Sequence, residues 1–140
     1  MEKLGKAERV SMFMQYAFDF FEKGSRELDE GLRVCDHLKV RDAAEKLWNA
    51  TVNAANALIL HELDVVPASH WERRKLLERL EDTLPEVERL GLRDRYGARE
   101  RYLHEMTFYG GIVDPETLRR EVEKVRKYLA DVKRLVGSDV

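Results

Sequence analysis

Apolar residues recur along the chain at spacings of three and four, which is the period of an α-helix, and no segment alternates with the period of a β-strand. The first such segment covers residues 8–38, where Gly24-Ser25 or Gly31 is expected to bend so long a helix. Phe18 and Phe20 fall partly outside its apolar stripe and indicate a second buried face. The stripe itself, which we expect to be buried, comprises Val10, Phe13, Ala17, Phe21, Leu28, Leu32 and Cys35.

Residues 42–63 are apolar on nearly every side, which predicts a helix in the middle of a bundle. The helix must end before Pro67, because the residue before a proline avoids the helical conformation. Ser69 and Glu72 form a capping box that predicts the start of a third helix. We expect Trp71, Leu76, Leu77 and Leu80 to be the apolar residues of that helix.

Pro85 follows the third helix and predicts a short continuation as far as Gly91. A fourth helix is predicted over residues 92–108, with Tyr96, Leu103 and Met106 on its inner face. The last helix begins at Asp114-Pro115-Glu116, an N-cap followed by a first-turn proline and acid, and ends at Gly137. The pattern therefore predicts an all-α, antiparallel bundle of about five helices in a single domain, residues 1–140, with the first two helices long and paired.

The composition supports such a domain and excludes several other classes. Hydrophobic residues make up 44% of the 140 residues and charged residues 37%, which is enough for a core under a charged surface. The single cysteine, Cys35, lies on the apolar stripe, so we expect a buried thiol without a disulfide partner and no multi-cysteine zinc site. The chain carries neither a glycine-rich phosphate loop nor a zinc-protease motif, so we expect no metal and no cofactor.

No apolar run approaches the length of a membrane span, since the longest, Ala54 to Leu60, contains Asn56. Near the N-terminus, Glu8 and Arg9 stand where a signal peptide would be apolar. We therefore expect a cytoplasmic protein. Asparagine and glutamine are scarce while Arg, Lys and Glu abound, a bias typical of proteins from hot environments.

The net charge of −2 argues against a dedicated DNA-binding protein. Only from residue 91 onward do basic residues outnumber acidic ones, and Arg93, Arg95, Arg99 and Arg101 lie close together there. These arginines form either a solvated, salt-bridged face or a site for an anion such as phosphate.

Arg99 precedes His104 with four residues between them. An arginine grips phosphate with a planar fork, and a histidine moves a proton near neutral pH. On RNA these groups suffice for cleavage without a metal: the histidine takes the proton of the attacking 2′-hydroxyl, and the arginine stabilises the developing charge. Residues five apart on an ideal helix point about 140° apart, so a shared phosphate requires the start of a helix or a second subunit.

The spacing of Arg99 and His104 is similar to the motif of HEPN domains, the helical nucleotide-binding domains of higher eukaryotes and prokaryotes. Over residues of about 40–136 the chain more closely resembles the archaeal PaREP-type proteins. The resemblance implies a small helical bundle that pairs two-fold, with the motif helices near the dimer axis. Many HEPN proteins are metal-independent endoribonucleases, and others only bind or scaffold. The residues that carry the closer resemblance are Ala44-Glu45-Lys46-Leu47-Trp48, Ser69-His70, Leu103-His104 and Phe108-Tyr109.

Three functions follow as hypotheses. The first is a homodimer that binds nucleotide or RNA phosphate at a two-fold cleft through the four clustered arginines. The second is a toxin-like, metal-independent endoribonuclease with Arg99 and His104 as its catalytic residues. The third is a protein-interaction module without a ligand. Glu100 follows Arg99 directly and would repel phosphate, so we expect binding without cleavage.

Overall fold

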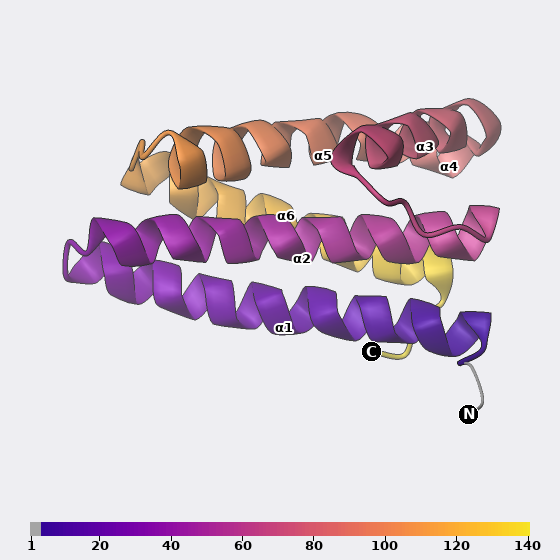
Figure 1. The fold of residues 1–140 in the computed structure, drawn as a ribbon, viewed down its shortest axis with the longest axis horizontal. Coiled ribbons are helices and arrows are strands. Elements are labelled where there is room, and N and C mark those ends of the chain that lie inside the picture. Colours follow the sequence, from indigo (N-terminus) through magenta and orange to yellow (C-terminus); the bar gives the residue numbers. More distant parts are fainter. Residues whose placement is uncertain (1–3) are drawn as a thin grey trace.

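The computed structural model describes residues 4–140, which form six α-helices, one π-helical segment and no strand. The all-α prediction is therefore confirmed. In Figure 1, α1 and α2 run antiparallel along their whole lengths, α6 lies behind them, and the remaining helices form a layer above α2. None of the helices in this part of the chain has the length and apolar character of a membrane span. The elements are α1 (Lys6–Arg33), α2 (His37–Leu63), α3 (His70–Thr83), α4 (Pro85–Leu90), α5 (Leu92–Arg99), η1 (Glu100–Tyr109) and α6 (Pro115–Val136).

The glycines of α1 serve helix packing, and α1 continues through them without interruption. A Cβ atom added at Gly24 would lie 3.2 Å from the carbonyl oxygen of Ala43 on α2. One added at Gly31 would lie 2.9 Å from the Cγ2 atom of Val40. The missing side chains thus let the backbones of α1 and α2 approach closely, where we had expected a bend.

The first helix ends at Arg33 rather than near residue 38, and Cys35 is exposed. Cys35 adopts a left-handed conformation with φ of 57°, and the amide of Asp36 donates to the carbonyl of Gly31 at 2.9 Å. This arrangement is a Schellman motif, which closes the end of α1. The carboxylate of Asp36 then caps α2 by accepting from the amide of Lys39. The prediction of a buried Cys35 was wrong because this turn carries the thiol off the apolar stripe.

The core surrounds α2, as its all-round apolar pattern predicts, and Trp48 at its middle is fully buried. Phe18 and Phe20 pack at the edge of this core and are half-buried. Trp71, one of the apolar residues of α3, lies on the surface, because Arg73 and Leu77 occupy the inward positions of this helix.

The predicted fourth helix changes its geometry at Glu100. Residues Leu92–Arg99 form α5, and the chain then continues as a π-helix through Tyr109. At its end the amide of Gly110 donates to the carbonyl of Glu105, five residues earlier, at 2.9 Å. π-Helices are rare and occur frequently at functional sites. In this geometry residues five apart, such as His104 and Tyr109, lie on the same side of the helix.

Candidate functional site

Arg99 ends α5 with its guanidinium inside the protein. Its Nε atom lies 2.7 Å from Oε1 of Glu121 on α6, and its Nη2 atom lies 2.9 Å from Oε2. The side chains of Arg99 and Glu121 are only 4% and 3% exposed. The Nη1 atom donates to the carbonyl of Arg95 at 3.3 Å, so about two of the five N–H groups of an arginine stay free.

His104 points toward a different helix. Its Nδ1 atom lies 2.9 Å from Oε2 of Glu45 on α2, and the two side chains are 16% and 21% exposed. Arg99 therefore extends toward α6 and His104 toward α2, so one chain does not bring them to the same point. An ionised carboxylate only accepts hydrogen bonds, so Nδ1 of His104 donates to Glu45, and in the neutral ring the lone pair lies on Nε2.

Aromatic rings enclose His104. The ring of Trp48 is tilted by 32° to the ring of His104 at a centroid distance of 5.7 Å, and Tyr109 makes an edge contact at 4.9 Å. The ring of His70, at the start of α3, lies 5.4 Å away. The buried Nε1 atom of Trp48 has no hydrogen-bond partner within residues 4–140. We call this group of His70, His104 and Glu45 the histidine cluster.

The surroundings of His70 disfavour its protonated form. Burial lowers its pKa first, and the guanidinium of Arg73 lowers it further. Nη1 of Arg73 lies 3.0 Å from Nδ1 of His70, and since an arginine only donates, Nδ1 accepts and the proton of the neutral ring sits on Nε2. Arg73 itself is buried and also donates to Asn56 and Tyr96. The histidine cluster therefore contains one histidine that is hydrogen-bonded to a carboxylate and one whose pKa is lowered by burial and by a neighbouring arginine.

Glu100 does not stand free beside Arg99. Nη1 of Arg74 lies 3.0 and 2.8 Å from its two carboxylate oxygens, and Glu100 is buried. The negative charge that the sequence places next to the arginine motif is thus neutralised by α3.

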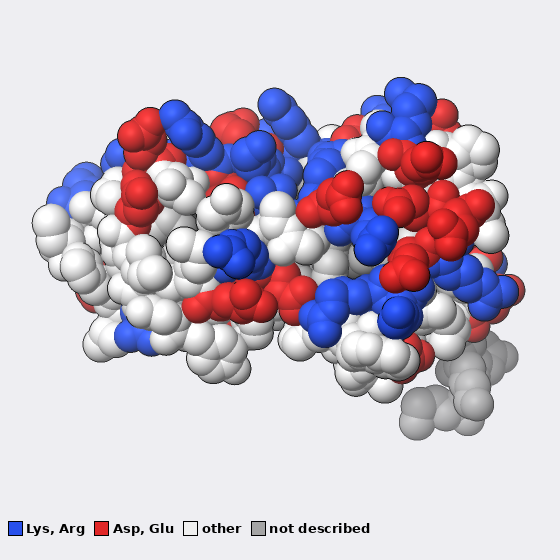
Figure 2. Space-filling view, turned by 90° about the horizontal axis from the view of Figure 1, so that it is seen from above, with Lys and Arg blue, Asp and Glu red and all other residues white. Residues whose placement is uncertain are grey.

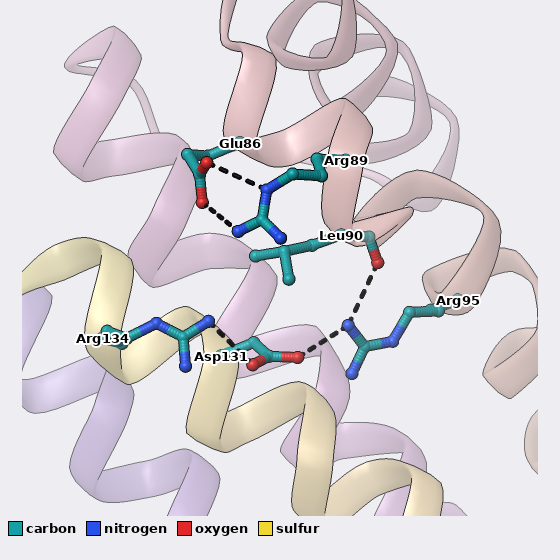
Figure 3. A network of polar contacts seen from close by, with 6 residues as sticks. All are labelled: Glu86, Arg89, Leu90, Arg95, Asp131 and Arg134. Carbon is teal, nitrogen blue, oxygen red and sulfur yellow. Dashed lines mark hydrogen bonds and ion pairs between the residues drawn. The ribbon is translucent and has the colours of Figure 1, made fainter.

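The other arginines of the cluster have different surroundings. Arg93 pairs with Glu81 at 3.0 Å, so it belongs to a salt-bridged face, and charges of both signs intermingle on the right of Figure 2. Arg95 donates to Asp131 at 2.8 Å and to the carbonyl of Leu90 at 3.2 Å, in the network of Figure 3. Arg101 is exposed and forms no ion pair with any residue in the 4–140 range.

A depression of about 460 Å³ lies between α5 and α6, and we call it the basic depression. Arg95 and Arg99 line it together with Lys124 and Lys127, neither of which pairs with a carboxylate of the described chain. Arg95 pairs with Asp131 and Arg99 with Glu121, so the two lysines are the cations of this depression without an ion-pair partner among the described residues. Lys124 and Lys127 were not among the residues predicted to bind an anion, although their spacing of three places them on one side of α6.

No group of three or more His, Cys, Asp or Glu side chains within residues 4–140 is placed to hold a metal ion. The chemical groups of these sites are histidines, arginines and lysines. They can hold a phosphate by charge and move a proton through His104.

The comparisons with known proteins give one family. Residues 19–129 match the model of the archaeal PaREP1/PaREP8 family. No curated protein and no solved structure matches the chain significantly.

Proposed function

The chain belongs to the archaeal PaREP1/PaREP8 family, and from this membership and its geometry we propose that it binds nucleotide or RNA phosphate as a HEPN-like homodimer. The proposal rests on the basic depression, which Lys124 and Lys127 line together with two arginines. Such a surface binds a phosphodiester chain by neutralising it and releasing its counterions.

The test is a salt titration of RNA binding. We expect a short oligoribonucleotide to bind, with an affinity that falls linearly with the logarithm of the salt concentration. Lys124→Glu/Lys127→Glu should abolish binding and flatten this slope. Lys23→Glu/Arg26→Glu on α1 changes the net charge equally at two exposed positions and serves as the matched control. Equal binding by both double variants would refute the proposal.

A second function, metal-independent RNA cleavage, is favoured by the pair of His104 and Glu45. A histidine whose Nδ1–H is held by a carboxylate has the orientation of a general base. Cleavage of single-stranded RNA in the presence of a chelator would establish it. His104→Ala should then remove cleavage and leave binding intact, and Glu45→Gln should slow cleavage because it no longer favours the imidazolium. If the RNA is still intact after prolonged incubation, cleavage is excluded and phosphate binding remains as the proposed function.

The homodimer is proposed from an apolar area at one end of the bundle. Val34, Leu38, Tyr109 and Ile112 are all exposed there, and Arg41 joins this end of α2 to the carbonyls of Phe108 and Tyr109. The left end of Figure 2 carries few charged side chains. The chain has a mass of 16.4 kDa, so light scattering should give twice that value, and Leu38→Glu should return it to the monomer.

A further inference from the structure

A second concavity lies on the opposite flank of α5 from the basic depression. This groove, between α3 and α5, has a volume of about 400 Å³, which is within the range of small-molecule sites. Trp71 stands at its rim with 63% of its surface exposed. It is one of two tryptophans in the chain. Tyr96 lies buried at the base of the groove.

Gly97 keeps the groove open. It also lines this space, and a Cβ atom added there would meet no atom within 4 Å. A flat ring can therefore enter alongside the indole of Trp71 without displacing a side chain at Gly97. An exposed indole is a stacking surface for any nucleobase, because every base has a π-face.

The charges of the groove favour a base over a phosphate. Glu78 and Asp94 line it and offer carboxylate oxygens that accept hydrogen bonds from exocyclic amino groups. Each of its three cations has a carboxylate partner: Arg74 binds Glu100, Arg93 binds Glu81, and Lys75 lies 3.9 Å from Glu78. A phosphodiester is better held on the other flank of α5, where Lys124 and Lys127 form no ion pair with a described carboxylate.

We infer that the groove between α3 and α5 takes an unpaired nucleobase stacked on Trp71, so that the ligand is single-stranded nucleic acid. This inference rests on the proposed function, since the phosphates of the same strand would lie in the basic depression. An α-helix with its side chains is about 10–12 Å wide, so a strand crossing α5 needs only a few nucleotides to reach both sites.

Fluorescence tests the groove without any phosphate. Trp48 is buried and Trp71 is exposed, so titration with adenosine, an uncharged nucleoside, should quench the emission of Trp71. Trp71→Phe should lose this change in emission. Gly97→Leu, which fills the groove, should also abolish the quenching, whereas Gly97→Ala should retain it.

Oligonucleotide binding supplies the second measurement. Trp71→Ala and Gly97→Leu should each weaken the binding of a single-stranded oligoadenylate about tenfold or more. Trp71→Phe should keep most of the wild-type affinity, because phenylalanine still offers an aromatic face. A DNA oligomer of the same sequence separates deoxyribose from ribose ligands, and a duplex should bind more weakly than either strand. Circular dichroism and thermal melting establish that each variant is folded.

The two proposals can fail separately. If Lys124→Glu/Lys127→Glu abolishes binding while Trp71→Ala and Gly97→Leu bind like the wild type, the groove is not a base site and the proposed function stands. If no oligonucleotide binds to the wild type, the proposed function is overturned. The adenosine titration then tests by itself whether the groove binds a base. Unchanged emission from Trp71 would overturn the inference about the groove as well.

Discussion

Arg99 and Glu121 form a two-pronged ion pair in the interior, with N–O distances of 2.7 and 2.9 Å, and tie α5 to α6. The arginine that carries the motif is thus also part of the structural framework. A variant at this position changes the fold's stability as well as any ligand contact, and the two effects require separate measurement.

Arg99→Ala should lower the free energy of unfolding by about 3–5 kcal/mol, because it leaves the carboxylate of Glu121 buried without a partner. Arg99→Met/Glu121→Leu should recover most of this loss, since both charges are then absent. Urea unfolding at neutral pH measures both effects. A single variant as stable as the wild type would contradict the buried pair.

Cys35→Gly should raise the free energy of unfolding by about 1 kcal/mol. A residue with a Cβ atom pays roughly 1–2 kcal/mol in the left-handed conformation, whereas glycine adopts it freely, at some cost in the entropy of the unfolded chain. Cys35→Ala is the matched control, because it removes the thiol and keeps the Cβ atom. The two variants should differ in melting temperature, with Gly higher, and equal values would show that the turn is unstrained.

His70 should make the protein less stable as the pH falls below neutrality. Its pKa is lowered in the folded state, so the unfolded chain binds the proton first. Stability that is present above the ordinary histidine pKa of about 6.5 is therefore lost as the pH falls toward the lowered value. The urea midpoint of His70→Gln should fall less between pH 7.5 and 5.5 than that of the wild type. His37→Gln, at an exposed position, should behave like the wild type.

Trp48→Ala should destabilise the protein by about 3–5 kcal/mol, because the indole is fully buried in the centre of the bundle. Chemical denaturation of the variant provides the measurement. An unchanged midpoint would be incompatible with the central position of α2.

The sequence was sufficient for the helices whose signals are local. The caps at Ser69 and Asp114 lie where they were predicted, since each depends on a side chain reaching an amide three residues away. The central position of α2 followed from its apolar surface. The turn at Cys35 was missed because a Schellman motif normally has glycine at that position, and the cysteine instead continues the apolar spacing of α1.

The site was less predictable than the fold. Arg99 and His104 were identified by spacing, but their partners Glu121 and Glu45 lie far away in the sequence and were not foreseen. No local signal distinguishes a π-helix from an α-helix over residues 100–109. Trp71 was named among the apolar residues of the third helix, yet the inward position belongs to Arg73, whose Nε donates a hydrogen bond to Oδ1 of Asn56.

The pairing of α1 with α2 also has a kinetic consequence. The two longest helices are joined by only Val34 to Asp36, so closing this hairpin costs little chain entropy, whereas α6 must return from a distant part of the sequence. The hairpin should then be formed in the transition state for folding and α6 should dock afterwards. Substituting Ala43 by glycine would chiefly slow folding, and truncating Val125 to alanine would chiefly accelerate unfolding. The N-terminal half of the chain would therefore determine how fast the native state is reached, and the C-terminal helix how long it persists.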